Sequence, residues 1–228
     1  MHPKFHFSFG DPAVGPHPVS LGKKKGLALL EARSSTSQYR HGGGGADPIH
    51  QSRDASVRRV TLDLDIHDGV AVVTWDEDEN RFNRDALGRW SQVVDQLEAS
   101  KGPLAVVVTA SGRFFSNGVD IDRIDNDVEV DKVVTELRLL LARLLVLPTY
   151  SVCAINGHAY GAGAIFTCAF DHRIMRTDRG FWCVNETALG IPLDEGLMGL
   201  VLHRLERNTG IDAILRSTRY GGFDCGFR

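Results

Sequence analysis

The chain has 228 residues, of which 43% are hydrophobic and 24% charged, a composition typical of one soluble globular domain with or without a tail. A formal net charge of −3 argues against the basic surface of a nucleic-acid-binding protein and against a polybasic membrane-binding stripe. The cysteines have no C-x-x-C spacing and three of the four lie in apolar runs, so we expect reduced thiols, a reducing compartment and no metal site (Cys153, Cys168, Cys183 and Cys225).

The first 56 residues differ in composition from the rest of the chain. They hold most of the prolines, five of the nine histidines, three consecutive lysines at 23–25 and four consecutive glycines at 42–45. No apolar periodicity is sustained, so we expect residues 1–56 to remain unpacked and residues 57–228 to form the folded domain. The apolar stretch at 27–30 is too short for a signal peptide, and the sequence leaves open whether this segment is a leader or a transit peptide.

The domain opens with a predicted β-hairpin. Residues 60–66 alternate apolar and polar side chains, residues 67–69 form a turn, and residues 70–75 return as a second strand. Helical spacing of apolar residues predicts a helix over 85–99. The continuous apolar run at 104–109 is typical of a strand buried on both faces.

The second half of the domain continues the alternation of strands and helices. We predict a helix over 131–147, ended by Pro148, a strand over 152–155, and a short helix running from Ala162 toward Ala169. A strand over 171–176 and a helix over 194–204 follow. This order indicates an α/β fold with parallel strands and crossover helices.

The longest uncharged stretch, residues 151–170, has the length of a membrane span and contains a G-x-x-x-G pattern. Polar, turn-forming residues at 156–158 interrupt it, however. A uniformly apolar span would have no such break, so we interpret the stretch as a strand, a loop and a buried helix, and we expect no membrane span.

Two glycine-bearing loops, at 114–120 and 156–163, each follow a strand-like run and lead toward a helix. N–H groups in the first turn of a helix lack internal partners, and small residues there let a ligand approach the backbone. We therefore predict that the backbone N–H groups of Asn117 and Ala162 converge on one oxygen and stabilise an oxyanion. A third segment, 185–192, supplies Glu186 as a candidate base. The two loops and this segment together predict acyl-thioester chemistry through an enolate.

Four motifs in order, FSNGVD at 115–120, AINGHAYGAG at 154–163, DHRIM at 171–175 and ETALGIP at 186–192, resemble the crotonase superfamily over about residues 60–222. The resemblance implies a spiral of ββα units and an acyl-CoA substrate, with coenzyme A entering as part of that substrate and no other cofactor. It implies oxyanion donors at Asn117 and Ala162. The implied substrate contacts are Asn117, Gly118, Val119, Asp120, Gly161 and Arg81. For Arg81 a phosphate contact and an ordinary surface position both remain open, and Asp120 suits a turn better than an acid.

The resemblance also implies which reaction follows, because hydratases of this superfamily use two glutamates. The first of those positions is Ile165, which cannot hold a proton, and the second is Glu186. One glutamate suffices to move a proton from C2 to C4 of a 3-enoyl-CoA, and residues 185–190 are similar to mitochondrial-type enoyl-CoA isomerases. Such a base needs a raised pKa, for which apolar neighbours are present (Trp182, Val184, Ala188 and Leu189).

We therefore expect a double-bond isomerase of fatty-acid oxidation. The alternatives are a hydratase-like or other thioester enzyme of the same fold and a catalytically silent acyl-CoA-binding protein. The superfamily continues past position 228 with helices that close the acyl pocket, so we expect a C-terminally truncated chain with reduced activity, and a homotrimer if the C-terminus were complete. We expect a cytoplasmic protein, with the peroxisome or mitochondrion as the alternative.

Overall fold

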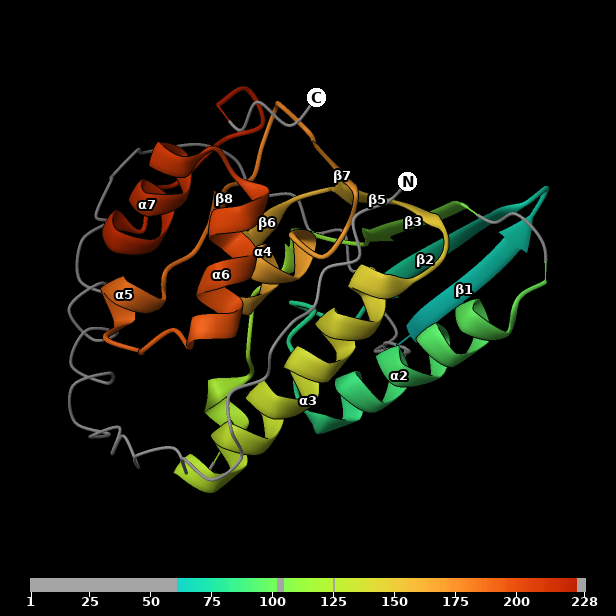
Figure 1. The fold of residues 1–228 in the computed structure, drawn as a ribbon, viewed down its shortest axis with the longest axis horizontal. Coiled ribbons are helices and arrows are strands. Elements are labelled where there is room, and N and C mark those ends of the chain that lie inside the picture. Colours follow the sequence, from blue (N-terminus) through green and yellow to red (C-terminus); the bar gives the residue numbers. More distant parts are fainter. Residues whose placement is uncertain (1–60, 102–104, 125, 225–228) are drawn as a thin grey trace, which may run out of the picture.

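A computed structural model describes residues 61–101, 105–124 and 126–224 (Figure 1). The segment 1–56, the first residue of the predicted opening strand and the first residue of the strand predicted at 104–109 lie outside these residues. The strands are β1 Thr61–His67, β2 Val70–Asp76, β3 Ala105–Ala110, β4 Phe114–Ser116, β5 Tyr150–Ile155, β6 His158–Tyr160, β7 His172–Met175 and β8 Trp182–Cys183. The helices are α2 Arg84–Ala99, η1 Ile121–Arg123, α3 Asp127–Val146, α4 Ala162–Thr167, α5 Glu186–Leu189, α6 Glu195–Arg204 and α7 Arg207–Arg216.

The strands form two sheets, one of five strands in the order β1-β2-β3-β5-β7 and one of three in the order β4-β6-β8. All neighbours are parallel except β1 and β2, which form the predicted antiparallel hairpin. Successive units β3-β4-α3, β5-β6-α4 and β7-β8-α5 each give one strand to each sheet before a helix follows. This winding confirms the α/β fold and the spiral of ββα units.

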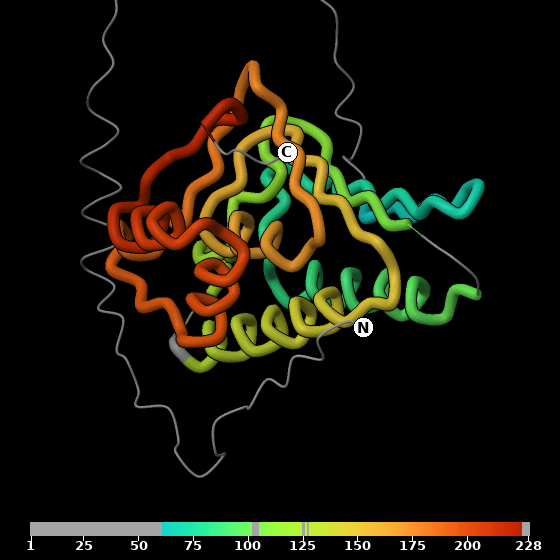
Figure 2. The backbone as a smooth tube through the Cα atoms, turned by 45° about the horizontal axis from the view of Figure 1, so that its top comes forward, coloured from blue at the N-terminus to red at the C-terminus, as the bar shows by residue number. Residues whose placement is uncertain are grey.

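Helices α2 and α3 lie side by side along the five-stranded sheet (Figures 1 and 2). Each begins at an asparagine whose side chain accepts a backbone N–H, Asn83 from Ala86 and Asn126 from Glu129. Such caps satisfy donors that a helix start leaves open. The cap at Asn126 explains why α3 begins four residues before the predicted start at Asp131. At the opposite end of the molecule from β1, α5, α6 and α7 gather together (Figure 1).

An aromatic cluster in the core fixes the position of α4. Trp75 of β2 packs against Trp90 of α2 with ring centroids 5.6 Å apart. Phe166 of α4 packs against the Trp90 ring at 5.0 Å and the Phe82 ring at 5.3 Å. All six residues of α4 are buried, so this short helix is held by its surroundings rather than by its own propensity.

The uncharged stretch 151–170 forms most of β5, then β6 and α4, as a strand, a turn with a short strand, and a buried helix. Within the described residues, no helix is both long enough and apolar enough to cross a membrane. Cys153, Cys168 and Cys183 are buried free thiols, in agreement with the reduced state expected for them.

Candidate active site

The two glycine-bearing loops meet at the carboxyl ends of β4 and β6, which are parallel neighbours in the three-stranded sheet. Gly118 has φ +80, and a Cβ at this position would lie 2.9 Å from the Tyr160 carbonyl oxygen and 3.4 Å from the Ala162 nitrogen. A side chain would therefore be both strained and in collision with backbone. Glycine at position 118 allows the two loops to touch.

Ala162 is the first residue of α4, and the preceding Gly161 has φ +54 and ψ −126. The Gly161 carbonyl accepts from the N–H groups of Ala164 and Ile165, which closes the first turn. In the part of the chain that the structure describes, the Ala162 N–H donates no hydrogen bond. It is therefore available as a donor, at the position that the sequence predicted.

Asn117 is placed differently from the sequence-based prediction. Its backbone N–H donates to the Glu79 carbonyl oxygen at 2.9 Å, and its side-chain Nδ2 donates to Glu79 Oε2 at 2.8 Å. An N–H already satisfied by a carbonyl cannot serve an oxyanion without breaking that bond. The assignment of Asn117 as an oxyanion donor is therefore not supported.

Val119 offers the second donor instead. Hydrogen bonds hold the residues on either side of it, from Phe82 N–H to the Gly118 carbonyl at 2.8 Å and from Asp120 N–H to the Phe82 carbonyl at 2.9 Å. Among the described residues the Val119 N–H finds no acceptor. Its signal in the sequence is its place directly after Gly118, the residue that brings this loop against Ala162.

Glu186 lies beside these donors. It begins α5, which starts after two further residues beyond the end of β8, the strand that neighbours β6. A Cβ on Gly161 would lie 3.2 Å from Glu186 Oε1, so the carboxyl group faces the backbone one residue before Ala162. Glu186 Oε2 is buried and has no hydrogen-bond partner among the described residues.

Burial raises the pKa of Glu186 from its ordinary 4.5 to about 7, against a smaller opposing effect of a hydrogen bond from its own backbone. A carboxyl group with this pKa can both take and return a proton near neutral pH. Of the apolar neighbours predicted to surround it, Trp182 and Val184 are buried, whereas Ala188 and Leu189 are exposed because α5 is a single turn at the surface.

The position predicted for a second acid, Ile165, is wholly buried in α4. It provides no group that could activate water. Among the described residues, no three His, Cys, Asp or Glu side chains lie close enough together to hold a metal ion. The site as described therefore combines one carboxyl group of raised pKa, that of Glu186, with two free backbone donors.

Arg81 does not face the site as a free cation. Its guanidinium pairs with Glu79 at 2.6 Å, Asp122 at 2.7 Å and Asp120 at 3.6 Å. Three carboxylates already satisfy its charge, so the structure favours a structural role over a phosphate contact. Asp120, which also pairs with Arg123 at 3.3 Å, is a buried structural residue of the same cluster.

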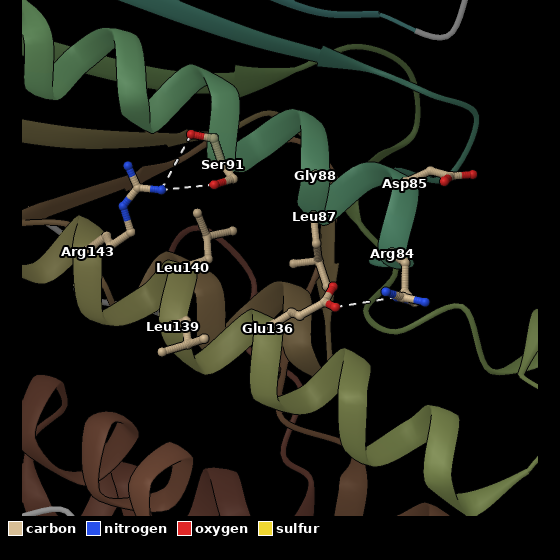
Figure 3. A pocket seen from close by; sticks show the side chains of 9 residues that line it. All are labelled: Arg84, Asp85, Leu87, Gly88, Ser91, Glu136, Leu139, Leu140 and Arg143. Atoms are coloured by element: carbon tan, nitrogen blue, oxygen red, sulfur yellow. Dashed lines mark hydrogen bonds and ion pairs between the residues drawn. The ribbon is translucent and has the colours of Figure 1, made fainter.

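A groove of about 610 Å³ lies between α2 and α3, away from these residues (Figure 3). Its two arginines are paired, Arg84 with Glu136 at 3.4 Å and Arg143 with Asp95 and Glu98. Neither the two donors nor Glu186 lines it. The groove is therefore separate from the candidate active site.

Comparison with known proteins gives consistent matches. The sequence pattern of the family described as enoyl-CoA hydratase/isomerase matches residues 65–224. Enoyl-CoA delta isomerase 3 of Arabidopsis thaliana is 31% identical over 136 residues, 57% of this chain and 57% of that protein. Ethylmalonyl-CoA decarboxylase of Danio rerio is 34% identical over 116 residues, 48% of this chain and 38% of that protein.

A solved structure of a probable enoyl-CoA hydratase from Mycobacterium tuberculosis matches with a TM-score of 0.68 at 24% identity, covering 73% of this chain and 72% of that one. This likeness shows the fold. The chain spans about half the length of the isomerases that it matches.

Proposed function

Because the chain belongs to the enoyl-CoA hydratase/isomerase (crotonase) family, we propose that it moves the double bond of a 3-enoyl-CoA to position 2, a reaction of fatty-acid oxidation. The observation that carries this proposal is the carboxyl group of Glu186, whose Oε2 atom is buried, beside Gly161, with a wholly buried isoleucine at the second acid position. A relative named as an enoyl-CoA delta isomerase supports it.

The proposed reaction needs one acid–base group. The N–H groups of Val119 and Ala162 hold the thioester oxygen, while Glu186 takes a proton from C2. The electron pair of the broken C–H bond spreads over the thioester oxygen and C4 as a dienolate. Glu186 then returns the same proton at C4, which leaves the double bond between C2 and C3. Hydration would require a second group to activate water, and Ile165 cannot act as one.

The direct test is isomerisation of 3-hexenoyl-CoA by the purified chain, followed by the ultraviolet absorbance of the conjugated product. We expect the absorbance to rise in proportion to enzyme concentration. A folded protein that binds the thioester and leaves the absorbance unchanged would contradict the proposal and favour a silent acyl-CoA-binding protein.

The pH dependence of this activity follows from the raised pKa of Glu186. The base must be ionised in the free enzyme, so kcat/KM should rise with pH to a plateau, with a midpoint near the pKa of about 7. A profile measured from about pH 5.5 to about pH 8.5 checks this expectation. A flat profile over that range would indicate that another group sets the rate.

Decarboxylation is a second candidate, favoured by the 34% identity to a relative named as an ethylmalonyl-CoA decarboxylase. The same two N–H groups would stabilise the enolate left when carbon dioxide departs. That reaction requires no base to remove a proton. Assays with an alkylmalonyl-CoA therefore separate the candidates, since only isomerisation should depend on the ionised Glu186.

A further inference from the structure

We propose that Ser116 is a positioning residue that sets the spacing of the two oxyanion donors, Val119 N–H and Ala162 N–H. This inference rests on the proposed function. Ser116 ends β4, is wholly buried, lies within the first loop of the candidate site and packs against the second. Its side chain is not aligned for nucleophilic chemistry, because its hydroxyl is committed to the backbone.

The Ser116 hydroxyl joins two backbone groups. It donates to the Asn80 carbonyl oxygen at 2.6 Å and accepts the Gly118 N–H at 3.3 Å. Gly118 directly precedes Val119, and its positive φ determines the direction in which the chain continues. The hydroxyl therefore restrains the peptide units from which the Val119 donor projects.

Asn80, whose carbonyl oxygen accepts the hydrogen bond from the Ser116 hydroxyl, is itself held in place. Asn80 is wholly buried, with φ +52, a left-handed conformation that asparagine tolerates better than most residues. Its side chain accepts the Glu77 N–H at 2.8 Å and donates to the Phe114 carbonyl at 2.9 Å. Ser116 is thus tied to a point that has little freedom to move.

Ser116 also supports the second loop, through packing. A Cβ on Gly163, in the first turn of α4, would lie 2.5 Å from the Ser116 carbonyl oxygen and 2.7 Å from Ser116 Cβ. The helix that begins with Ala162 therefore lies directly on Ser116. One residue is hydrogen-bonded to one donor loop and in packing contact with the other, so it fixes their separation.

Removal of the hydroxyl should act on catalysis more than on binding. Both donors must be aligned with the oxygen as charge develops on it, and small misplacements of catalytic groups are costly. We expect Ser116→Ala to lower kcat by about tenfold or more while KM changes by less than about threefold, since a misaligned donor mainly weakens the transition state.

Ser151→Ala is a matched control. Ser151 is also buried, and its hydroxyl also makes two hydrogen bonds, donating to the Asp171 carboxylate at 2.8 Å and accepting the Asp171 N–H at 3.1 Å. It lies in β5 of the other sheet. Both variants should lose similar stability, but only Ser116→Ala should lose kcat. Ser116→Cys, which keeps a weaker donor and acceptor, should fall between wild type and Ser116→Ala, and it serves if the alanine variant does not fold.

The second readout is the absorbance of a bound dienoyl-CoA thioester, which moves to longer wavelength when hydrogen bonds polarise its carbonyl. The shift should be present in wild type and Ser151→Ala and reduced in the Ser116 variants. An active wild type with unchanged kcat and shift in those variants would overturn the role of Ser116 and leave the proposed function standing. An inactive wild type would overturn the proposed function, and the shift alone would then decide the role of Ser116. A wild type without activity or shift would overturn both.

Discussion

Glu186→Gln should lower kcat for 3-enoyl-CoA isomerisation by about 10³-fold, within the range of about 10²- to 10⁴-fold typical of general acid–base groups. Glutamine has the size and shape of glutamate but cannot accept a proton from C2. The two backbone donors are unchanged, so the variant should still bind the thioester and polarise its carbonyl. Steady-state kinetics together with the absorbance shift of a bound dienoyl-CoA check both parts. A variant that retains more than about a tenth of the wild-type kcat would show that Glu186 is not the base.

The same substitution should not destabilise the protein. The pKa of Glu186 is raised in the folded state from 4.5 to about 7, so protonation favours folding. This contribution is fully present below the ordinary pKa and is lost as pH rises through about 7. Above that pH the neutral glutamine should be more stable than the carboxylate by about 1 to 3 kcal/mol. Denaturant unfolding of both proteins at about pH 5 and about pH 8 measures the difference, which should grow with pH.

The sequence predicts helix α2 more accurately than the short strands of the second sheet. Helix α2 begins one residue before its predicted start and ends at its predicted end, because its apolar periodicity is read directly from the chain. The strands β4, β6 and β8 have only two or three residues each. Their extended conformation is stabilised by parallel pairing with one another, which no local pattern records.

In the candidate site too, features that are local in the sequence were predicted, and features that depend on distant contacts were not. Ala162 is recognisable because it follows Gly161 at a helix start, and that feature is local. The assignment of Asn117 fails because the Glu79 carbonyl, 38 positions earlier, takes its N–H. The ion pairs of Arg81 likewise depend on Asp120 and Asp122, about 40 positions away. Contacts at such separations are determined by the fold, so the sequence alone identified the loops but not Val119, the second donor that we propose.

Ala162→Pro tests the backbone donors of the proposed site. It removes the N–H group of residue 162 and replaces only a methyl side chain, which has no acid–base function. Proline is tolerated at the first position of a helix, and Gly161 has no Cβ to clash with the ring. The hydrogen bonds that close the first turn run from Ala164 and Ile165 to the Gly161 carbonyl and do not involve the lost N–H. We expect kcat to fall by about 10²- to 10³-fold, the effect typical of losing one oxyanion donor.

Ala162→Gly is the matched control, because it also changes the side chain at the helix start but keeps the N–H. Its kcat should stay within about threefold of wild type, since the N–H that we propose to stabilise the enolate is retained. The two variants together separate the donor from the packing around it. Equal losses in both would show that the alanine methyl group matters and would remove Ala162 N–H from the mechanism. Loss in the proline variant alone, with folding intact by circular dichroism, would place the developing negative charge at the first turn of α4.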